Sequence, residues 1–294
     1  MKEQKNEIKE LKRLTEDEIV ARIEAHRHYI FRNVKGWKAC ADFSGCDLSG
    51  VNFYWIGQTI SPNEPLDLSG AIFFGADLSD ADLSNTVLDS CDFRNARLFR
   101  ANLEETACCG ADFSAATALY CNLNGADFAS CDFARANFRG ACISGATFDT
   151  CELMEANFSQ VQAERPAALL NCNGTRALFC GANLGYSDLS MSDFSGAIFS
   201  DADLSNATLH NVTANDTIFC GSLMSYVTAN NTSFRQADFT GADLCGIRFE
   251  KCDFSDATFQ WTNLTAANLP DSLDFETSDD GGIKIAFQKK RYRM

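Results

Sequence analysis

The 294-residue sequence predicts a four-sided solenoid, an all-β rod of stacked coils, and three observations support this fold class. Large apolar residues recur at every fifth position, residues 20 apart carry the same kind of side chain, and all four prolines avoid the regular repeats. A strand has a side-chain period of two and a helix a period of 3.6, so neither fits the five-residue spacing. A chain that turns a corner after each short extended segment does fit it.

Each five-residue unit has two inward positions. A small residue precedes the large one by two, and Asp or Asn usually lies between them, as in Ala76-Asp77-Leu78. Four units complete one coil, so residues 20 apart should stack. The sequence shows this second period in two columns of phenylalanine: Phe73, Phe93, Phe113 and Phe133 in the first half, and Phe179, Phe199, Phe219, Phe239 and Phe259 in the second.

The repeats form one domain over residues 39–270, with interruptions at 54–65 and 159–173. The first interruption keeps the phase, and we expect it to span two faces irregularly. The second should replace most of one coil and add a one-residue bulge, which puts Phe179 on the column of Phe158. Proline lacks the N–H that stacked coils need, and the four prolines lie in these interruptions or at the end of the repeats: Pro62, Pro65, Pro166 and Pro270. The repeats have room for about 11–12 coils at ~4.8 Å each.

Residues 1–38 are predicted to form an N-terminal helical cap, with a helix at about 15–32. Thr15 and Glu18 match a capping box, and Leu14 and Ile19 match a hydrophobic staple. The helix should cover the first coil, because an open solenoid end exposes unpaired backbone. In the C-terminal tail, 271–294, the segment DSLDFETSDDGG is expected to be a loop, IKIAF one short strand, and KKRYR a basic tail.

The charge distribution favours a basic protein partner. The chain has a net charge of −15, and residues 39–270 carry 28 acidic and 10 basic side chains. Such a surface repels nucleic acids and membranes. No apolar run approaches the ~18–20 residues of a membrane span, and the charged N-terminus lacks the apolar region of a signal peptide. We therefore expect a soluble, cytoplasmic protein whose 14 cysteines are free thiols.

Two groups of outward residues are candidates for partner binding. Four carboxylates recur once per coil and would form a linear anionic surface that fits a basic groove built for DNA: Asp92, Asp112, Asp132 and Glu152. The alternative is that the repeat simply favours Asp there and that solvent and salt screen the charge. Tyr186 and Tyr226 should share one side of the rod, two coils apart. Exposed aromatics often anchor interfaces, although scattered ones are ordinary on protein surfaces.

The sequence assigns no catalytic residue, cofactor or metal. The cysteines form no CxxC pair and the only histidines are His26, His28 and His210, so a zinc site is not expected. Cys131 and Cys151 occupy small inner positions and are predicted to be buried free thiols. The chain has no phosphate-binding glycine loop, nucleophile elbow or paired His/carboxylate signature. A regular solenoid also offers no deep pocket.

The repeats ADFSG, ADLSD, ADLSN, CDFRN and ANLEE resemble those of the pentapeptide-repeat proteins, and the resemblance covers about residues 39–270. It implies a right-handed quadrilateral parallel β-helix. One bacterial branch of that family binds type II topoisomerases, mimics duplex DNA and gives quinolone resistance. On that interpretation the partner is DNA gyrase or topoisomerase IV, and Glu164 and Arg165 in the second interruption would touch the enzyme. No helix of the kind through which those relatives dimerise follows the last coil, so a homodimer is left open without support.

The function predicted from these observations is that of a non-enzymatic, rigid protein-interaction surface, with DNA-mimicking modulation of a bacterial topoisomerase as its most specific form. The alternative is a structural or effector-type scaffold. Such a scaffold would bind an unrelated protein through the outward aromatics or the N-terminal helix.

Overall fold

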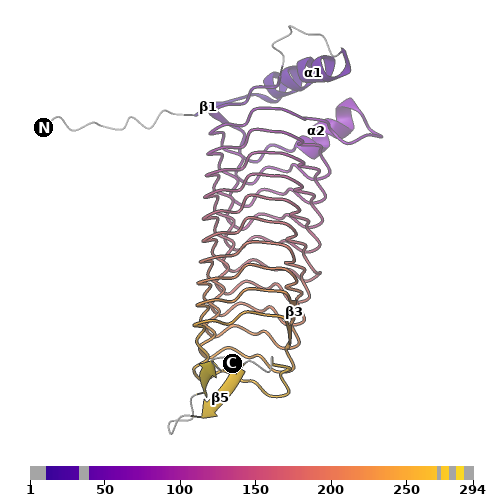
Figure 1. The fold of residues 1–294 in the computed structure, drawn as a ribbon. Coiled ribbons are helices and arrows are strands. Elements are labelled where there is room, and N and C mark those ends of the chain that lie inside the picture. The colour runs from indigo at the N-terminus through magenta and orange to yellow at the C-terminus, as the bar shows by residue number, and fades with distance from the viewer. Residues whose placement is uncertain (1–10, 33–39, 270–272, 278–282, 288–294) are drawn as a thin grey trace, which may run out of the picture.

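The computed structural model describes residues 11–32, 40–269, 273–277 and 283–287, and these form a rod of stacked coils (Figure 1). Four ladders of parallel bridges run along the rod, each joining residues 20 apart in its regular part. We number the four faces by these ladders, which pass through Asp92–Asp112 on face 1, Arg97–Thr117 on face 2, Asn102–Asn122 on face 3 and Ala107–Asp127 on face 4. The predicted four-sided coil with its period of 20 residues is therefore confirmed.

Face 1 shows how many tiers the rod contains. Its ladder passes through eleven of them, at residues 42, 72, 92, 112, 132, 152, 173, 193, 213, 233 and 253. Most contacts are single bridged pairs, because the chain turns after every fifth residue. Phe93 N–H donates to the Asp112 carbonyl of the next tier at 2.7 Å, and Asp92 N–H donates to the Ala71 carbonyl of the tier before at 3.0 Å. Each tier is thus bonded to both neighbours.

The corners depend on residues in the left-handed backbone region. Asn95 has φ 57° and Gly110 has φ 68°, and many corners carry larger residues in the same conformation, such as Arg100 at φ 55°. For an ordinary residue this conformation costs about 1–2 kcal/mol. The tier-to-tier hydrogen bonds and the packed interior offset that cost.

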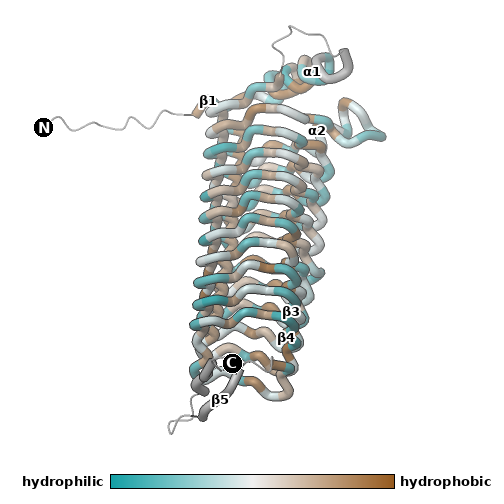
Figure 2. The backbone as a smooth tube through the Cα atoms, in the orientation of Figure 1, coloured by the Kyte–Doolittle hydropathy of each residue, from teal (hydrophilic) through white to brown (hydrophobic). Residues whose placement is uncertain are grey.

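The core is a stack of like side chains. The rings of Phe73 and Phe93 are 4.8 Å apart and 3° from parallel, and Phe93 and Phe113 repeat this geometry at 4.7 Å and 2°. Phe158 and Phe179, which flank the second interruption, also stack, at 5.7 Å and 16°. The predicted columns are therefore present on both sides of that interruption. Along every coil hydrophobic and hydrophilic residues alternate (Figure 2).

Helix α1, Glu16–Arg32, lies across the N-terminal end of the rod (Figure 1). The predicted capping box forms: Thr15 N–H donates to Glu18 Oε2 at 2.9 Å, and Glu18 N–H donates to Thr15 Oγ1 at 3.2 Å. Ile19 and Ile23 are buried in the core. Just before the helix, β1 (Lys12–Arg13) pairs in parallel with β2 (Cys46–Asp47) of the first coil.

The first interruption is an insertion at one corner, and the expected irregular passage over two faces is wrong. Asn52 pairs with Asp82, half a coil later than the regular period requires, whereas Asp67 pairs with Val87 at the regular period. The ten additional residues leave the corner between faces 3 and 4 as helix α2, Phe53–Ile60, followed by a loop with Pro62 and Pro65. A helix forms here because Asn52 Oδ1 accepts a hydrogen bond from Trp55 N–H at 2.6 Å and because Phe53 and Ile56 are buried.

The second interruption is narrower than residues 159–173. Cys142 pairs with Gln162 at the regular period, and Thr147 pairs with Ala168, one position later than that period requires. The single additional residue therefore lies between Gln162 and Ala168, at the corner that contains Pro166, and the coil itself is retained. The coil persists because its inward positions are still filled by Val161, Ala163, Ala167 and Leu169, all buried.

Four short strands complete the structure at its C-terminal end. Strands β3 (Thr228–Asn230) and β4 (Arg248–Glu250) pair in parallel on face 4. Strands β5 (Leu273–Thr277) and β6 (Ile283–Phe287) pair in an antiparallel hairpin. The expectation that DSLDFETSDDGG is a loop is wrong over β5, where the alternating Leu273, Phe275 and Thr277 favour a strand. Pro270 and the basic KKRYR segment lie outside the described residues. Among the described helices, none is long and apolar enough to cross a bilayer.

Candidate protein-interaction faces

The four predicted carboxylates form one column on face 1. Asp92, Asp112, Asp132 and Glu152 are consecutive in its ladder, and the column continues through Asn173 to Asp193. They come together because each occupies the outward position between the two inward residues of its repeat.

An arginine partly neutralises the first two carboxylates of this column. Arg94 Nη2 lies 2.7 Å from Asp92 Oδ2, and its Nε lies 3.6 Å from Asp112 Oδ2 in the next tier. The hydrogen bonds from Arg94 lower the pKa of Asp92, and the same contact raises the pKa of Arg94. The guanidinium also lies 5.5 Å from the centre of the Phe74 ring. This end of the column is an ion-pair cluster.

Asp132 and Glu152 have neutral hydrogen-bond donors in place of an arginine. Asp132 Oδ1 accepts a hydrogen bond from Ala134 N–H at 2.8 Å, and Glu152 Oε2 accepts one from Asn173 Nδ2 at 2.7 Å. Within the described part of the chain, no ion pair involves either carboxylate. These two residues are therefore the anionic centre of face 1.

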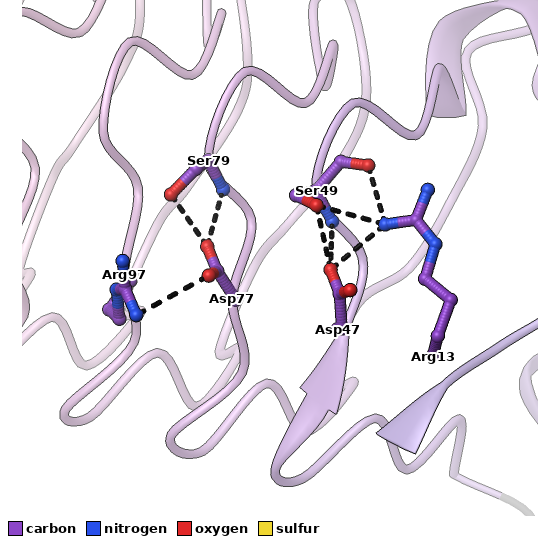
Figure 3. A network of polar contacts seen from close by, with 6 residues as sticks. All are labelled: Arg13, Asp47, Ser49, Asp77, Ser79 and Arg97. Carbon is purple, nitrogen blue, oxygen red and sulfur yellow. Dashed lines mark hydrogen bonds and ion pairs between the residues drawn. The ribbon is translucent and has the colours of Figure 1, made fainter. Parts of the chain in front are cut away.

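Other outward aspartates have a structural task that bears on this interpretation. Asp77 Oδ1 accepts hydrogen bonds from Ser79 N–H at 3.0 Å and from Ser79 Oγ at 2.6 Å, and Arg97 of the next tier approaches Asp77 Oδ2 at 3.5 Å (Figure 3). Asp47 makes the same contacts with Ser49, which, with contributions from Arg13, lower its pKa. The Asp-x-Ser pattern thus closes a turn on its own, and an outward Asp alone does not indicate a binding site.

The other predicted residues lie on a different part of the rod. The edge between faces 3 and 4, on the far side from face 1, carries Glu164, Arg165, Tyr186 and Tyr226. The predicted residues therefore form two separate groups. Glu164 N–H donates to Ser144 Oγ at 2.8 Å, and Arg165 Nη2 donates to the Ser144 carbonyl at 3.3 Å. These contacts hold the inserted corner against the preceding tier.

Tyr186 and Tyr226 are corner residues with φ 61° and 59°, and their side chains are 67% and 61% exposed. Leu223, which was not among the residues predicted from the sequence, is 48% exposed on the adjoining face 3. Its signal is visible in the repeat GSLMS, where Leu occupies the outward position that usually carries Asp or Asn.

The inner cysteines are buried hydrogen-bond donors. Cys131 Sγ donates to the Cys108 carbonyl at 2.7 Å, and Cys151 Sγ donates to the Phe128 carbonyl at 2.9 Å. Ser192 takes the same role further along, where its Oγ donates to the Leu169 carbonyl at 2.8 Å. Burial raises the pKa of the Cys131 thiol, so it stays protonated and unreactive at neutral pH.

Two cavities lie at the N-terminal end of the rod. One of about 400 Å³ is lined by Lys12, Arg22, Asp42 and Cys46 among others, and one of about 300 Å³ lies between the start of α1 and Trp55 of α2. The described residues contain no group of three His, Cys, Asp or Glu side chains that could hold a metal ion.

Solved structures with similar repeats share low identity with this chain. HetL, a pentapeptide repeat protein involved in heterocyst differentiation regulation in the cyanobacterium Nostoc sp. strain PCC 7120, is 23% identical, with a TM-score of 0.37, over 75% of this chain and 92% of HetL. Full-length QnrB1, a plasmid-mediated fluoroquinolone resistance protein, is 19% identical, with a TM-score of 0.27, over 76% of this chain and 92% of QnrB1. Rfr23 from the cyanobacterium Cyanothece 51142 is 26% identical, with a TM-score of 0.24, over 43% of this chain and 89% of Rfr23. A search of curated proteins returned no significant match.

Two family models match the repeats directly. The model of pentapeptide repeats (8 copies) matches residues 66–89, 91–129 and 131–165. The model of the pentapeptide repeat region matches residues 192–269. Together they cover most of the stacked coils, on both sides of the second interruption.

Proposed function

Because the chain belongs to the pentapeptide-repeat family, whose repeats wind into a right-handed β-helix, we propose that it is a non-enzymatic, rigid protein-interaction rod. In its leading task it presents the acidic column of face 1 to a basic groove that normally holds duplex DNA. The observation that carries this proposal is the pair Asp132 and Glu152, which continue the column of Asp92 and Asp112 in consecutive tiers without an ion-pair partner in the described chain.

The charge spacing supports this task. Neighbouring tiers are about 4.8 Å apart, and one strand of B-DNA carries one phosphate per ~3.4 Å of helix axis. The carboxylates from Asp92 to Glu152, one per tier, therefore have a spacing close to that of the phosphates of one DNA strand, with Arg94 offsetting charge at the Asp92 end, on a scaffold that does not need to be ordered on binding. Preorganisation of this kind lowers the entropic cost of association.

The partner that we propose is a bacterial type II topoisomerase, DNA gyrase or topoisomerase IV. The family resemblance points to this class, and the net negative charge of residues 39–270 suits a basic DNA-binding groove.

A supercoiling assay with purified gyrase, with and without a quinolone, tests this proposal. The wild-type protein should change supercoiling or quinolone inhibition at micromolar concentration. The double variant Asp132→Asn/Glu152→Gln should need about ten times more protein, since a tenfold change equals about 1.4 kcal/mol of binding energy. The matched control Asp203→Asn/Asp243→Asn removes two carboxylates from face 3 and should behave as wild type. No effect of the wild-type protein would remove the topoisomerase proposal.

A second candidate function is a scaffold that binds an unrelated protein through the N-terminal end. Trp55 on α2 is 65% exposed and borders the cavity of about 300 Å³ beside α1. In a pull-down from the native host, binding lost in Trp55→Ala and kept in the face 1 double variant would favour this function.

A further inference from the structure

Among the described residues of the second half of the rod, three of the five large exposed apolar side chains lie on face 3 or its edge toward face 4, while Met191 and Trp261 lie on other edges. Leu223 lies on the ladder of face 3, and Tyr226 ends the same repeat at the edge toward face 4. Tyr186 lies on that edge two tiers earlier. We call Tyr186, Leu223 and Tyr226, together with Asp203 and Asp243, the tyrosine ledge.

The ledge is held in place by the backbone of the next tier. Tyr186 N–H donates to the Ser205 carbonyl at 2.8 Å, and Tyr226 N–H donates to the Cys245 carbonyl at 2.9 Å. The Tyr226 ring also lies against Gly246, where an added Cβ would come within 2.6 Å of the ring atom Cε1. An exposed aromatic that is already fixed loses little conformational freedom when it binds a partner.

The other edge of face 3 leaves space beside the ledge. Its corners toward face 2 carry Gly181 at φ 61°, Asp201 at φ 57° and Gly221 at φ 67°, and the short Asp201 side chain lies against Gly221, where an added Cβ would come within 2.6 Å of its Oδ1. A partner can therefore lie along face 3 against the tyrosines without a clash at the opposite edge.

The two tyrosines lie in an acidic stretch of the rod; Arg165 lies one tier before Tyr186 on the same edge, and Arg248 lies on face 4, where it pairs with Thr228. Residues 177–234 contain no Lys or Arg, and their acidic residues are Asp188, Asp193, Asp201, Asp203 and Asp216. Leu223 lies between Asp203 and Asp243 in the ladder of face 3. Asp203 accepts a hydrogen bond from Ser205 N–H at 2.8 Å, and Asp243 accepts one from Asn263 Nδ2 at 2.8 Å. These donors are neutral, so neither hydrogen bond pairs the carboxylate with a cation.

The spacing of the anchors fits a helix that lies along the rod. Two tiers separate Tyr186 from Tyr226, which is about 10 Å at the usual distance between neighbouring strands. Two turns of an α-helix advance by about 11 Å, so apolar side chains at i and i+7 would meet the two tyrosines. Leu223 lies in the tier of Tyr226, so the side chain at i+7 or i+8 would meet it, and a side chain at i+3 or i+4 would lie over the tier between the two tyrosines.

We propose that the tyrosine ledge binds a basic amphipathic α-helix of a partner protein. The apolar stripe of this helix packs on Tyr186, Leu223 and Tyr226, and its Lys and Arg side chains pair with Asp203 and Asp243. The inference rests on the proposed role of the rod as a protein-interaction surface, but it uses face 3 and its edge and does not depend on the acidic column.

The test uses the full-length chain and a fluorescein-labelled peptide of about 18 residues, long enough for ~27 Å of helix, made of Leu at i, i+3, i+4 and i+7 spacing with Lys elsewhere. Fluorescence anisotropy measures its affinity for wild-type protein, with a scrambled peptide of the same composition as control. The double variant Tyr186→Ala/Tyr226→Ala should bind at least about tenfold more weakly, as expected for aromatic anchors. The double variant to Phe should restore most of the affinity.

Matched variants separate the ledge from general attraction between acidic protein and basic peptide. Tyr120→Ala removes an exposed tyrosine from another edge and should leave the affinity unchanged. Asp203→Asn/Asp243→Asn should weaken binding and flatten its salt dependence more than Asp132→Asn/Glu152→Gln does.

Three results would overturn the inference: no peptide binding by the wild type, equal binding of the scrambled peptide, or a greater loss of affinity in the face 1 double variant than in the face 3 double variant. Thermal melts of all variants confirm that they are folded. Peptide binding through the ledge together with no effect on gyrase would refute the topoisomerase proposal alone, and the reverse pair of results would refute the ledge alone.

Discussion

At the scale of single residues, the outward aspartate has two separate uses. In Asp42, Asp47 and Asp253 the carboxylate accepts hydrogen bonds from the Ser two positions later, and these bonds lower the pKa of each Asp. Asp132 is followed by Ala134 and lacks the hydroxyl partner. The outward position of all these residues could be predicted from the repeat. The repeat does not predict which of these carboxylates form ion pairs, because that depends on side chains of neighbouring tiers, as with Arg94 between Asp92 and Asp112.

The lowered pKa values predict the acid sensitivity of the rod. A carboxylate with a lower pKa in the folded state stabilises the fold fully above its unfolded pKa of about 3.9, and this contribution is lost as the pH falls through the folded pKa. The free energy of unfolding should therefore decrease below about pH 4. Ser44→Ala and Ser255→Ala should each reduce stability at pH 7 and make the loss between pH 7 and pH 3 smaller, as measured by urea denaturation.

Ser200→Ala is the matched control for these variants. Ser200 occupies the same repeat position, but the residue two positions before it is Ile198 in place of Asp, so its hydroxyl has no such carboxylate to bond. Its pH profile should match that of the wild type. An unchanged profile in Ser255→Ala as well would show that the Asp-Ser contact does not set the acid sensitivity.

At the scale of elements, the two helices differ in how far the sequence predicts them. The signals of α1 are local and strong, namely a capping box, a staple and an apolar stripe. Helix α2 is short, Phe53–Ile60, with a glycine and several β-branched side chains in its sequence. Its helical state depends on burial of Phe53 and Ile56 against the rod, which is a tertiary effect. Strand β5 was missed for a related reason, because its residues find a partner only when β6 folds back on them.

Loss of the cap should loosen α1 without unfolding the rod. Thr15→Ala removes the hydroxyl that accepts from Glu18 N–H, a change that typically costs about 1 kcal/mol. Hydrogen exchange should become faster in the amides of α1 and stay unchanged in the tiers around residue 199. Thr208→Ala, on an outward position of face 4, is the control and should leave α1 protected. Equal loss of protection along the whole rod would contradict the expectation that α1 can loosen while the rod stays folded.

At the scale of the whole molecule, the columns define the register of the rod. The period of 20 residues could be predicted from the sequence because Phe and Leu occupy separate columns on different faces. The continuity of the columns across residue 165 could also be read, since Phe158 and Phe179 are separated by one coil plus one residue. The sequence does not predict that this additional residue is confined to a single corner, because Ala163 and Ala167 fit either a coil or a loop.

Deletions test whether the columns or only the five-residue spacing stabilise the rod. Deletion of residues 200–219 removes one tier and leaves every remaining column aligned, so the protein should fold with a similar melting temperature. Deletion of residues 200–214 keeps the five-residue spacing but moves Phe219, Phe239 and Phe259 onto the Leu column of face 3. This variant should lose several kcal/mol through overpacking and cavities. Equal melting temperatures would show that sorting by face is not needed.

The hydrogen bonds between tiers have a mechanical consequence. They point along the long axis, so a force that separates the two ends pulls directly against the bonds of the terminal tier. That tier peels away before the next one is loaded. Each detached tier releases about 66–72 Å of extended chain in exchange for one tier of rod, ~4.8 Å. Under axial tension the protein should therefore unwind in equal steps, one tier at a time.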